Sequence, residues 1–438
     1  MDARVIDAAS FAGEVIDPQH AGYDKLRRVW NALHDRRPAL ILQPRNAADV
    51  QAGIRLAIER RLPLAVRGGG HSLPGFSTCD KGIVLDLSRL NQIEVDPVRR
   101  IAKAGGGALL ADLDKAGNPH GLVTPAGVVS HTGVGGLTLG GGMGWLSRRF
   151  GMTVDNLIAA EVCLADGTLV TADADNHPDL FWALRGGGGN FGVVTRFDFR
   201  MHPLGGVCIG AWEYDIGALR PALKKYRELA AKAPRHVTTS FAAKRTLFSV
   251  TAFASDGQAP SEIEGFGRLA TGAKGGITGM SFLELQARAD DVVAWGRRYY
   301  TKGGFFTELS DAAIETIGDR VSRTPSPDVE IYALQLGGAV KDVSEAATAY
   351  SGRAAEFYWI ANAMWNDPAE DAACISWGRE SSRQLALHSA ATNYVNEQSD
   401  SGVAQSAYGA EKYMRLAAIK RRYDPDNVFR LNQNIAPA

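Results

Sequence analysis

The sequence predicts an α+β fold built as two domains. Its 438 residues exceed the length at which a single hydrophobic core usually stops growing. Short strands and helices are mixed in the first half, without the regular βαβ alternation of a doubly wound parallel sheet. Glycine gathers in four clusters there, at 68–70, 105–107, 133–144 and 186–192.

The N-terminal part supplies well-patterned elements. Residues 47–60 read as a helix because Val50, Ile54 and Ala57 share one face, and Pro63 lies just beyond its end. Asp166-Gly167 between two apolar runs indicates a hairpin. Strands are expected at 62–66, 82–87, 157–164, 168–171 and 192–201, and a short helix at 108–116.

The middle of the chain has a different pattern. Residues 221–231 and 344–355 carry alanine and charged residues at helical spacing, whereas 249–254 and 330–336 alternate apolar and polar residues. We therefore expect an antiparallel sheet flanked by helices. Aromatic residues are frequent here, and most are expected in the core, with a few facing a ligand.

Composition excludes several classes of partner. The chain has 48 basic and 48 acidic residues, so no basic surplus favours nucleic acid or an anionic membrane surface. No apolar run approaches membrane-spanning length. Four cysteines lie far apart without a metal-ligand spacing, so no metal is expected. The start lacks the pattern of a signal peptide, and we expect a cytoplasmic protein, monomeric or homodimeric, that acts on a small molecule.

The first motif is the loop Arg67-Gly68-Gly69-Gly70-His71-Ser72, which follows an apolar strand. Three glycines expose a row of backbone N–H groups, and such a row can bind a pyrophosphate. His71 would then lie beside whatever the phosphates carry. Taken alone, the hexapeptide is equally compatible with an ordinary turn after a strand.

The second motif is the stretch 126–145. It contains seven glycines within 133–144, which argues against a stable helix interior and lets the backbone approach a flat or phosphorylated ligand. Asp155 follows Gly133 at a distance that a dinucleotide-binding fingerprint would favour. The NAD alternative is weak, because no clear parallel strand precedes Gly133.

Two further motifs complete the set. Residues 176–194 form a short aromatic helix, a glycine run and a strand, which is typical of a C-cap and turn or of a loop beneath a cofactor. Tyr394 and Asn396 form a Tyr-x-Asn pair, and the chain closes with the polar segment 423–435. A lone tyrosine is more often a core residue than a catalyst.

These four elements, in this order, resemble the berberine-bridge-enzyme-like branch of the vanillyl-alcohol-oxidase superfamily, and the resemblance covers essentially the whole chain. It implies a flavoprotein with covalently bound FAD. His71 matches the histidine that is linked to the flavin 8α-methyl group, and Tyr394 and Asn396 match a pair near the isoalloxazine ring. The other expected FAD contacts are Arg67, Gly68, Gly69, Gly70, Ser72, Gly75, Gly127, Thr132, Gly133, Gly135, Gly136, Gly140, Gly142, Trp145, Gly192, Val194, Asn432 and Asn434.

The chain departs from the family pattern at one place. Many members carry a second flavin link from a cysteine in a Gly-Val-Cys-Pro-Thr setting, and here Val129 occupies that position. A single covalent bond through His71 is therefore expected. Thr132 occupies the position that controls oxygen access in relatives, where valine is common in oxidases and leucine in dehydrogenases. His131 is either an active-site donor or a loop residue.

The resemblance also implies the domain plan and the chemistry. Residues 1–204 and 386–438 are expected to form a split FAD-binding domain, and 205–385 the substrate domain. The flavin would take a hydride from an alcohol or amine carbon and pass electrons to O2. Tyr394 is expected as the catalytic base, which requires a lowered pKa, with Asn396 and Thr132 beside it. A dehydrogenase with another acceptor and a non-catalytic flavin-binding protein are the alternatives.

Overall fold

The computed structural model describes residues 11–257 and 260–438. Its α-helices are α1 (Tyr23–Leu26), α2 (Ala47–Glu59), α3 (Leu110–Gly117), α4 (Val134–Gly140), α5 (Ser147–Phe150), α6 (Pro178–Leu184), α7 (Leu219–Lys232), α8 (Pro260–Ile263), α9 (Phe282–Ala287), α10 (Asp311–Val321), α11 (Ala339–Asp342), α12 (Asp371–Ala386) and α13 (Ala404–Tyr423). None of the helices in these residues is long and apolar enough to cross a bilayer.

The strands fall into four sheets. They are β1 (Glu14–Ile16), β2 (Leu40–Gln43), β3 (Leu64–Arg67), β4 (Ile83–Asp86), β5 (Ile93–Asp96), β6 (Ile101–Gly105), β7 (Leu122–Val123), β8 (Leu157–Cys163), β9 (Leu169–Ala172), β10 (Val193–Arg200), β11 (His202–Pro203), β12 (Val207–Asp215), β13 (Val237–Ala243), β14 (Leu247–Ala254), β15 (Lys274–Met280), β16 (Arg298–Phe306), β17 (Glu330–Gln335) and β18 (Phe357–Trp365).

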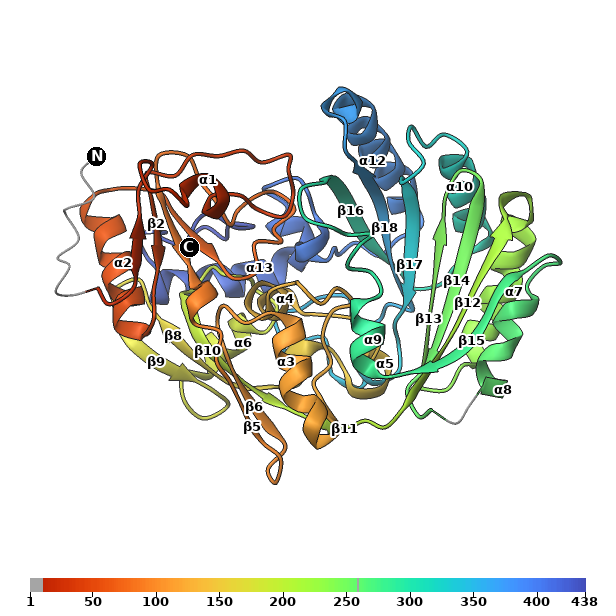
Figure 1. Cartoon of the computed structure of the whole chain (residues 1–438), viewed down its shortest axis with the longest axis horizontal. Coiled ribbons are helices and arrows are strands. Elements are labelled where there is room, and N and C mark those ends of the chain that lie inside the picture. The colour runs from red at the N-terminus through yellow and green to blue at the C-terminus, as the bar shows by residue number, and fades with distance from the viewer. Residues whose placement is uncertain (1–10, 258–259) are drawn as a thin grey trace.

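The N-terminal half is built on two small sheets (Figure 1). One has the order β1-β2-β4-β3, with β2, β4 and β3 parallel, and the other is an antiparallel sheet of order β5-β6-β10-β8-β9. Helix α2 begins at Asn46, whose side chain accepts a hydrogen bond from the Asp49 N–H and thereby satisfies a free donor of the first turn. The loop 68–72 follows β3 at the end of the parallel sheet.

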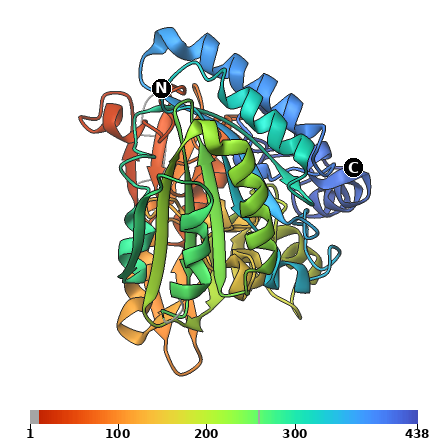
Figure 2. The same cartoon turned by 90° about the vertical axis from the view of Figure 1, so that its right-hand side faces the viewer.

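The other half is a seven-stranded antiparallel sheet of order β15-β12-β14-β13-β17-β18-β16. All neighbouring strands in it are antiparallel, and successive side chains of each strand point to opposite faces of the sheet. One face carries Phe241, Val250, Ile331 and Trp359 into a core with α7, α10 and α12. Figure 2 views this half from the side that faces away from the N-terminal half, with helices lying over the sheet. The opposite face looks toward the N-terminal half.

The C-terminal segment returns to the N-terminal half, and α13 lies beside its sheets (Figure 1). The Lys420 ammonium is fully buried and donates to the carbonyls of Asn190 and Phe429 and to Asp424. Leu416 and Ile435 pack into the core that contains Phe197 from β10. The predicted two-part α+β fold, in which the C-terminal segment joins the N-terminal half, is confirmed, and the boundaries 1–204, 205–385 and 386–438 stay a prediction.

Two element predictions were wrong. Residues 344–355 are not helical, since Arg353 instead pairs with Asp155 through two 2.7 Å contacts and Gly352 adopts a φ of 105°. This pairing also occupies the carboxylate that the NAD alternative required. The glycine-rich stretch does contain a helix, α4. Its low helical propensity is offset by packing against backbone, which the small residues permit.

Candidate functional site

One cavity of about 680 Å³ lies between the two halves and brings all four sequence motifs together. The predicted residues that line it are Gly68, Gly69, Gly70, His71, Ser72, Gly127, Thr132, Gly133, Gly135, Gly136, Trp145, Gly192, Val194, Tyr394, Asn396 and Asn432. Those outside its lining are Arg67, Gly75, Gly140, Gly142 and Asn434. Motifs that are far apart in sequence therefore line the same cavity in the folded protein.

Glycine is required where two of these motifs touch. A Cβ on Gly69 would lie 2.3 Å from the Gly133 nitrogen, and a Cβ on Gly133 would lie 2.2 Å from the Gly69 nitrogen. Real Cβ atoms do not approach backbone so closely, so both positions exclude side chains. Gly70 adopts a φ of 73°, a region that L-residues other than glycine rarely occupy.

Other glycines leave room for a ligand. A Cβ on Gly136 or on Gly189 would meet no protein atom within 4 Å, and both residues line the cavity. Buried polar atoms without a partner also surround it, namely Ser77 Oγ, Trp145 Nε1 and Asn432 Oδ1. Because buried polar groups are normally hydrogen-bonded, these atoms and the open glycine cradle fit a large flat ligand with polar edges, such as FAD.

His71 is held tightly at the end of its loop. Its Nε2 lies 2.8 Å from Nδ1 of His131, and its ring stacks on Trp30 with centroids 4.8 Å apart. Burial, reinforced by the neighbouring His131, lowers the pKa of His71 to about 3. The imidazole is therefore neutral near pH 7, the state in which a ring nitrogen is nucleophilic. His131 Nε2 is buried without a partner.

Several predicted contacts support the site from behind the cavity wall. The buried Arg67 guanidinium donates to the carbonyls of Ser77, Leu26 and Arg27, so it orders the loop. Gly75 adopts a φ of 73°. The Gly142 N–H donates to the hydroxyl of Tyr394, and a Cβ on Gly140 would overlap Asn396.

Tyr394 is buried at the junction of the two halves. Its hydroxyl oxygen accepts hydrogen bonds from the Gly142 N–H and from Asn396 Nδ2, both at 3.0 Å. These donors favour the ionised form, but burial outweighs them and raises the pKa of Tyr394 above its usual value. The lowered pKa expected from sequence is therefore absent in this state, and the phenol keeps its proton.

Polar residues of the large sheet form the opposite wall. Glu330, Tyr332, Tyr358 and Asn362 project from β17 and β18 into the cavity, and Glu397 enters it just after the Tyr-x-Asn pair. Sequence reasoning did not single out the two glutamates. The position of Glu397 next to Asn396 was an available signal, whereas Glu330 resembled any polar residue of an alternating strand.

No cysteine occupies the position from which many family members form a second covalent bond to the flavin. Val129 lines the cavity at the expected position, as does Thr132. The four cysteines Cys79, Cys163, Cys208 and Cys374 are buried and free, and none belongs to the cavity wall. The loop between Val129 and Thr132 is fixed by Ser130, whose N–H and hydroxyl both donate to Asp290.

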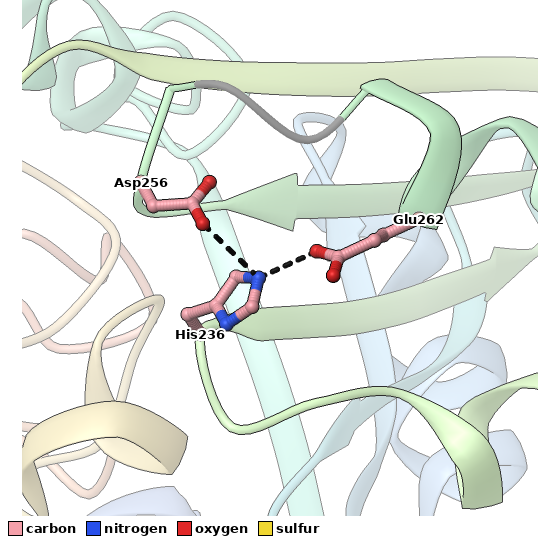
Figure 3. A group of neighbouring side chains, drawn as sticks. All are labelled: His236, Asp256 and Glu262. Atoms are coloured by element: carbon pink, nitrogen blue, oxygen red, sulfur yellow. Dashed lines mark hydrogen bonds and ion pairs between the residues drawn. The ribbon is translucent and has the colours of Figure 1, made fainter.

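A separate polar group lies away from the cavity (Figure 3). His236 Nε2 is 2.5 Å from Glu262 and 3.3 Å from Asp256, and the three ligand-type atoms lie within 4.8 Å of one another. Both carboxylates are exposed. They share one imidazole nitrogen, so the arrangement is explained by hydrogen bonding between the ends of β13, β14 and α8.

Comparison with known proteins decides the family. The FAD binding domain family matches residues 38–173, and the family described as berberine and berberine like matches residues 392–436. An FAD-linked oxidoreductase of Dictyostelium discoideum is 32% identical over 419 residues, which cover 94% of this chain and 92% of that protein. The chain belongs to the berberine-bridge-enzyme-like FAD-linked oxidoreductases.

Characterised family members agree with this assignment. The (R)-6-hydroxynicotine oxidase of Paenarthrobacter nicotinovorans is 28% identical over 474 residues, covering 100% of this chain and 99% of that enzyme. The crystal structure of 6-hydroxy-D-nicotine oxidase from Arthrobacter nicotinovorans superposes with a TM-score of 0.88 and 28% identity, over 99% of this chain and 100% of that one. Glucooligosaccharide oxidase from Acremonium strictum, with 6-S-cysteinyl, 8α-N1-histidyl FAD, shares the fold at a TM-score of 0.88 and 23% identity, over 97% of each chain.

Proposed function

We propose that this protein is an oxidase that carries FAD through a single covalent bond to His71. It removes a hydride from a carbon that bears an amine or hydroxyl group and passes the electrons to O2. The observation that carries this proposal is the cavity itself, in which the neutral imidazole of His71 and the hydroxyl of Tyr394 face one space lined by open glycines. The buried free cysteines support a cytoplasmic location.

Bound FAD supplies the hydride acceptor. The residues of this chain hold it and handle the substrate proton. The loops around Gly69 and Gly133 bring backbone N–H groups close together, as a pyrophosphate requires. Tyr394 faces the cavity with a hydroxyl whose oxygen already accepts two hydrogen bonds. These two donors favour the phenolate, which is the form of Tyr394 that can accept the substrate proton.

The choice of electron acceptor depends on the loop that carries Thr132. Its side chain lines the cavity beside Val129, and it is smaller than the leucine that the family resemblance associates with dehydrogenases. This favours oxygen access and hence an oxidase. Peroxide formation in air with the most reactive compound of an alcohol and amine panel tests this part, because a dehydrogenase would reduce an artificial acceptor and form little peroxide.

The cofactor part is tested by acid precipitation followed by peptide mass mapping. We expect yellow colour to remain in the pellet and one FAD adduct on the His71 peptide. His71→Ala should leave flavin that acid releases, with the fold intact by circular dichroism. An adduct on a cysteine peptide would refute the single link, and a colourless protein after reconstitution with FAD would refute the function.

A further inference from the structure

Glu397 is the one cavity-lining carboxylate that is left without a partner in the described part of the chain. It ends a short turn after Tyr394, and no hydrogen bond or ion pair reaches its carboxylate. Burial alone raises its pKa to about 7. An isolated carboxylate in a partly enclosed site is costly unless a ligand brings a compensating charge or hydrogen bond.

The second carboxylate of the cavity, Glu330, is different because it has partners. The Asn362 amide donates to it at 3.3 Å, and the Lys244 ammonium lies 4.0 Å away. Lys244 also lies 3.8 Å from Asp328. Glu330 is therefore partly compensated within the protein, which makes it a matched comparison for Glu397.

The charges around Glu397 do not neutralise it. Tyr332, Tyr358 and Tyr394 face it, and its negative charge raises the pKa of each of these phenols. Lys302 on β16 is already bound to Asp400 at 3.0 Å. Among the described residues that line the cavity, Arg288 is the one cationic side chain, because the His71 imidazole is neutral, and Arg288 is exposed.

We infer that the substrate of this site carries a basic nitrogen that is protonated in solution, and that Glu397 is its counter-ion. This inference rests on the proposed function, because it names the substrate class of the same cavity. A bound ammonium group would supply the positive charge that the Glu397 carboxylate lacks as a partner. The phenols of Tyr332 and Tyr358 would form the walls on which an alkylammonium or heterocyclic body packs.

The same contact affects the catalytic hydroxyl. The Glu397 charge raises the pKa of Tyr394, and a cation bound between them would oppose that effect. Substrate binding would thus move Tyr394 toward the state in which it accepts a proton. The site would discriminate against a neutral alcohol of the same shape, since an alcohol leaves the Glu397 charge uncompensated.

Isothermal titration calorimetry with three matched probes tests the inference: benzylammonium, benzyl alcohol and benzoate. The proteins are the flavin-loaded wild type, Glu397→Gln, Glu330→Gln and the surface control Glu411→Gln. We expect benzylammonium to bind more tightly than the other two probes. Glu397→Gln should weaken this binding by about tenfold or more, the usual weight of a hydrogen bond to a charged group, while Glu411→Gln changes nothing. Benzyl alcohol should bind Glu397→Gln no more weakly than wild type.

The pH dependence supplies a second readout. Benzylammonium binding should weaken as the pH falls through about 7, where Glu397 becomes protonated, and this dependence should disappear in Glu397→Gln. An unchanged affinity in Glu397→Gln, preference for benzoate, or failure of benzylammonium to bind the wild type would each overturn the inference. Since calorimetry detects binding without turnover, an intact ammonium site in a protein that makes no peroxide would count against the proposed function alone.

Discussion

At the residue scale, the cavity depends on side chains that keep one reactive atom free. Tyr394 receives two hydrogen bonds at its oxygen and has no acceptor for its proton among the described residues. His71 uses Nε2 for His131, which leaves Nδ1 as the other ring nitrogen. In each case a neighbouring group fixes the orientation of a side chain that lines the cavity.

Tyr394→Phe removes the proposed base without changing the shape of the site. We expect the variant to retain covalent flavin, because the contact between Gly69 and Gly133 does not involve Tyr394. Anaerobic flavin reduction by the best compound of the amine panel should slow by about a hundredfold or more, as followed by stopped-flow absorbance. Near-normal reduction in a folded, yellow variant would assign the proton transfer to another group.

His131 is expected to act on His71 as a positioning residue. In His131→Ala the imidazole of His71 loses its 2.8 Å partner and becomes free to rotate. The fraction of flavin that survives acid precipitation should fall severalfold, whereas His131→Gln, which can still form a hydrogen bond, should restore most of it. Wild-type levels of bound flavin in His131→Ala would show that stacking on Trp30 is sufficient.

At the element scale, α4 is a helix that forms despite the low helical propensity of its sequence. It contains three glycines, at 135, 136 and 140, and each of them lowers helical stability. The surroundings of the helix explain why these positions are glycine. Gly135 faces the carbonyl of Gly106, Gly140 faces Asn396, and Gly136 faces the open cavity. Two glycines are thus required by protein neighbours and one leaves room for a ligand.

Gly136→Leu should separate folding from flavin binding. A leucine side chain would meet no protein atom near its Cβ and would raise helical propensity by roughly 0.5–1 kcal/mol. It would also fill the cavity. We expect a folded protein of unchanged or higher melting temperature and little flavin, with Gly136→Ala intermediate. Full flavin occupancy in Gly136→Leu would show that the cofactor does not pass over α4.

Helices α3 and α9 join the two halves through a buried polar pair. Gln286 Nε2 donates to Asp114 at 3.1 Å and to the carbonyl of Gly127 at 3.0 Å. Burial raises the pKa of Asp114 from 3.8 to about 7. Between about pH 4 and 7 the folded protein therefore holds a proton that the unfolded chain lacks, so this residue's contribution to stability decreases as pH rises through that window.

Asp114→Asn should remove this pH dependence. Near pH 8 the variant should be more stable than wild type by about 1–3 kcal/mol, because no charge is buried and the amide can donate to Gln286 Oε1, which lacks a partner. Near pH 4 the two proteins should unfold alike. Thermal unfolding at both pH values, with the exposed Asp175→Asn as control, measures the difference. Equal melting temperatures at pH 8 would contradict the raised pKa.

At the scale of the whole molecule, sequence reasoning performed best where one local pattern decides the structure. It identified α2, the β8–β9 hairpin and the loop around His71, because periodicity and turn residues act over a few positions. It failed at 344–355, where a long-range pair between Arg353 and Asp155 replaced a helix. It also missed Glu397. The position of Glu397 beside Asn396 was an available signal, but the residues of β17 and β18 that line the same cavity are far from it in sequence.

The return of the C-terminal segment gives the last prediction. Lys420 and Asp424 are fully buried, 2.5 Å apart, and the Lys420 ammonium also reaches Asn190 and Phe429. Asp424→Asn would leave that ammonium without its counter-charge, which typically costs about 3–5 kcal/mol. Chemical denaturation should show such a loss, and flavin content should fall as well, since Asn432, a few residues further along, donates to Gly189 in the cavity wall. Glu411→Gln on the exposed side of the same helix is the control. A loss below about 1 kcal/mol would mean that the C-terminal segment is held by its apolar contacts, such as Ile435, rather than by this pair.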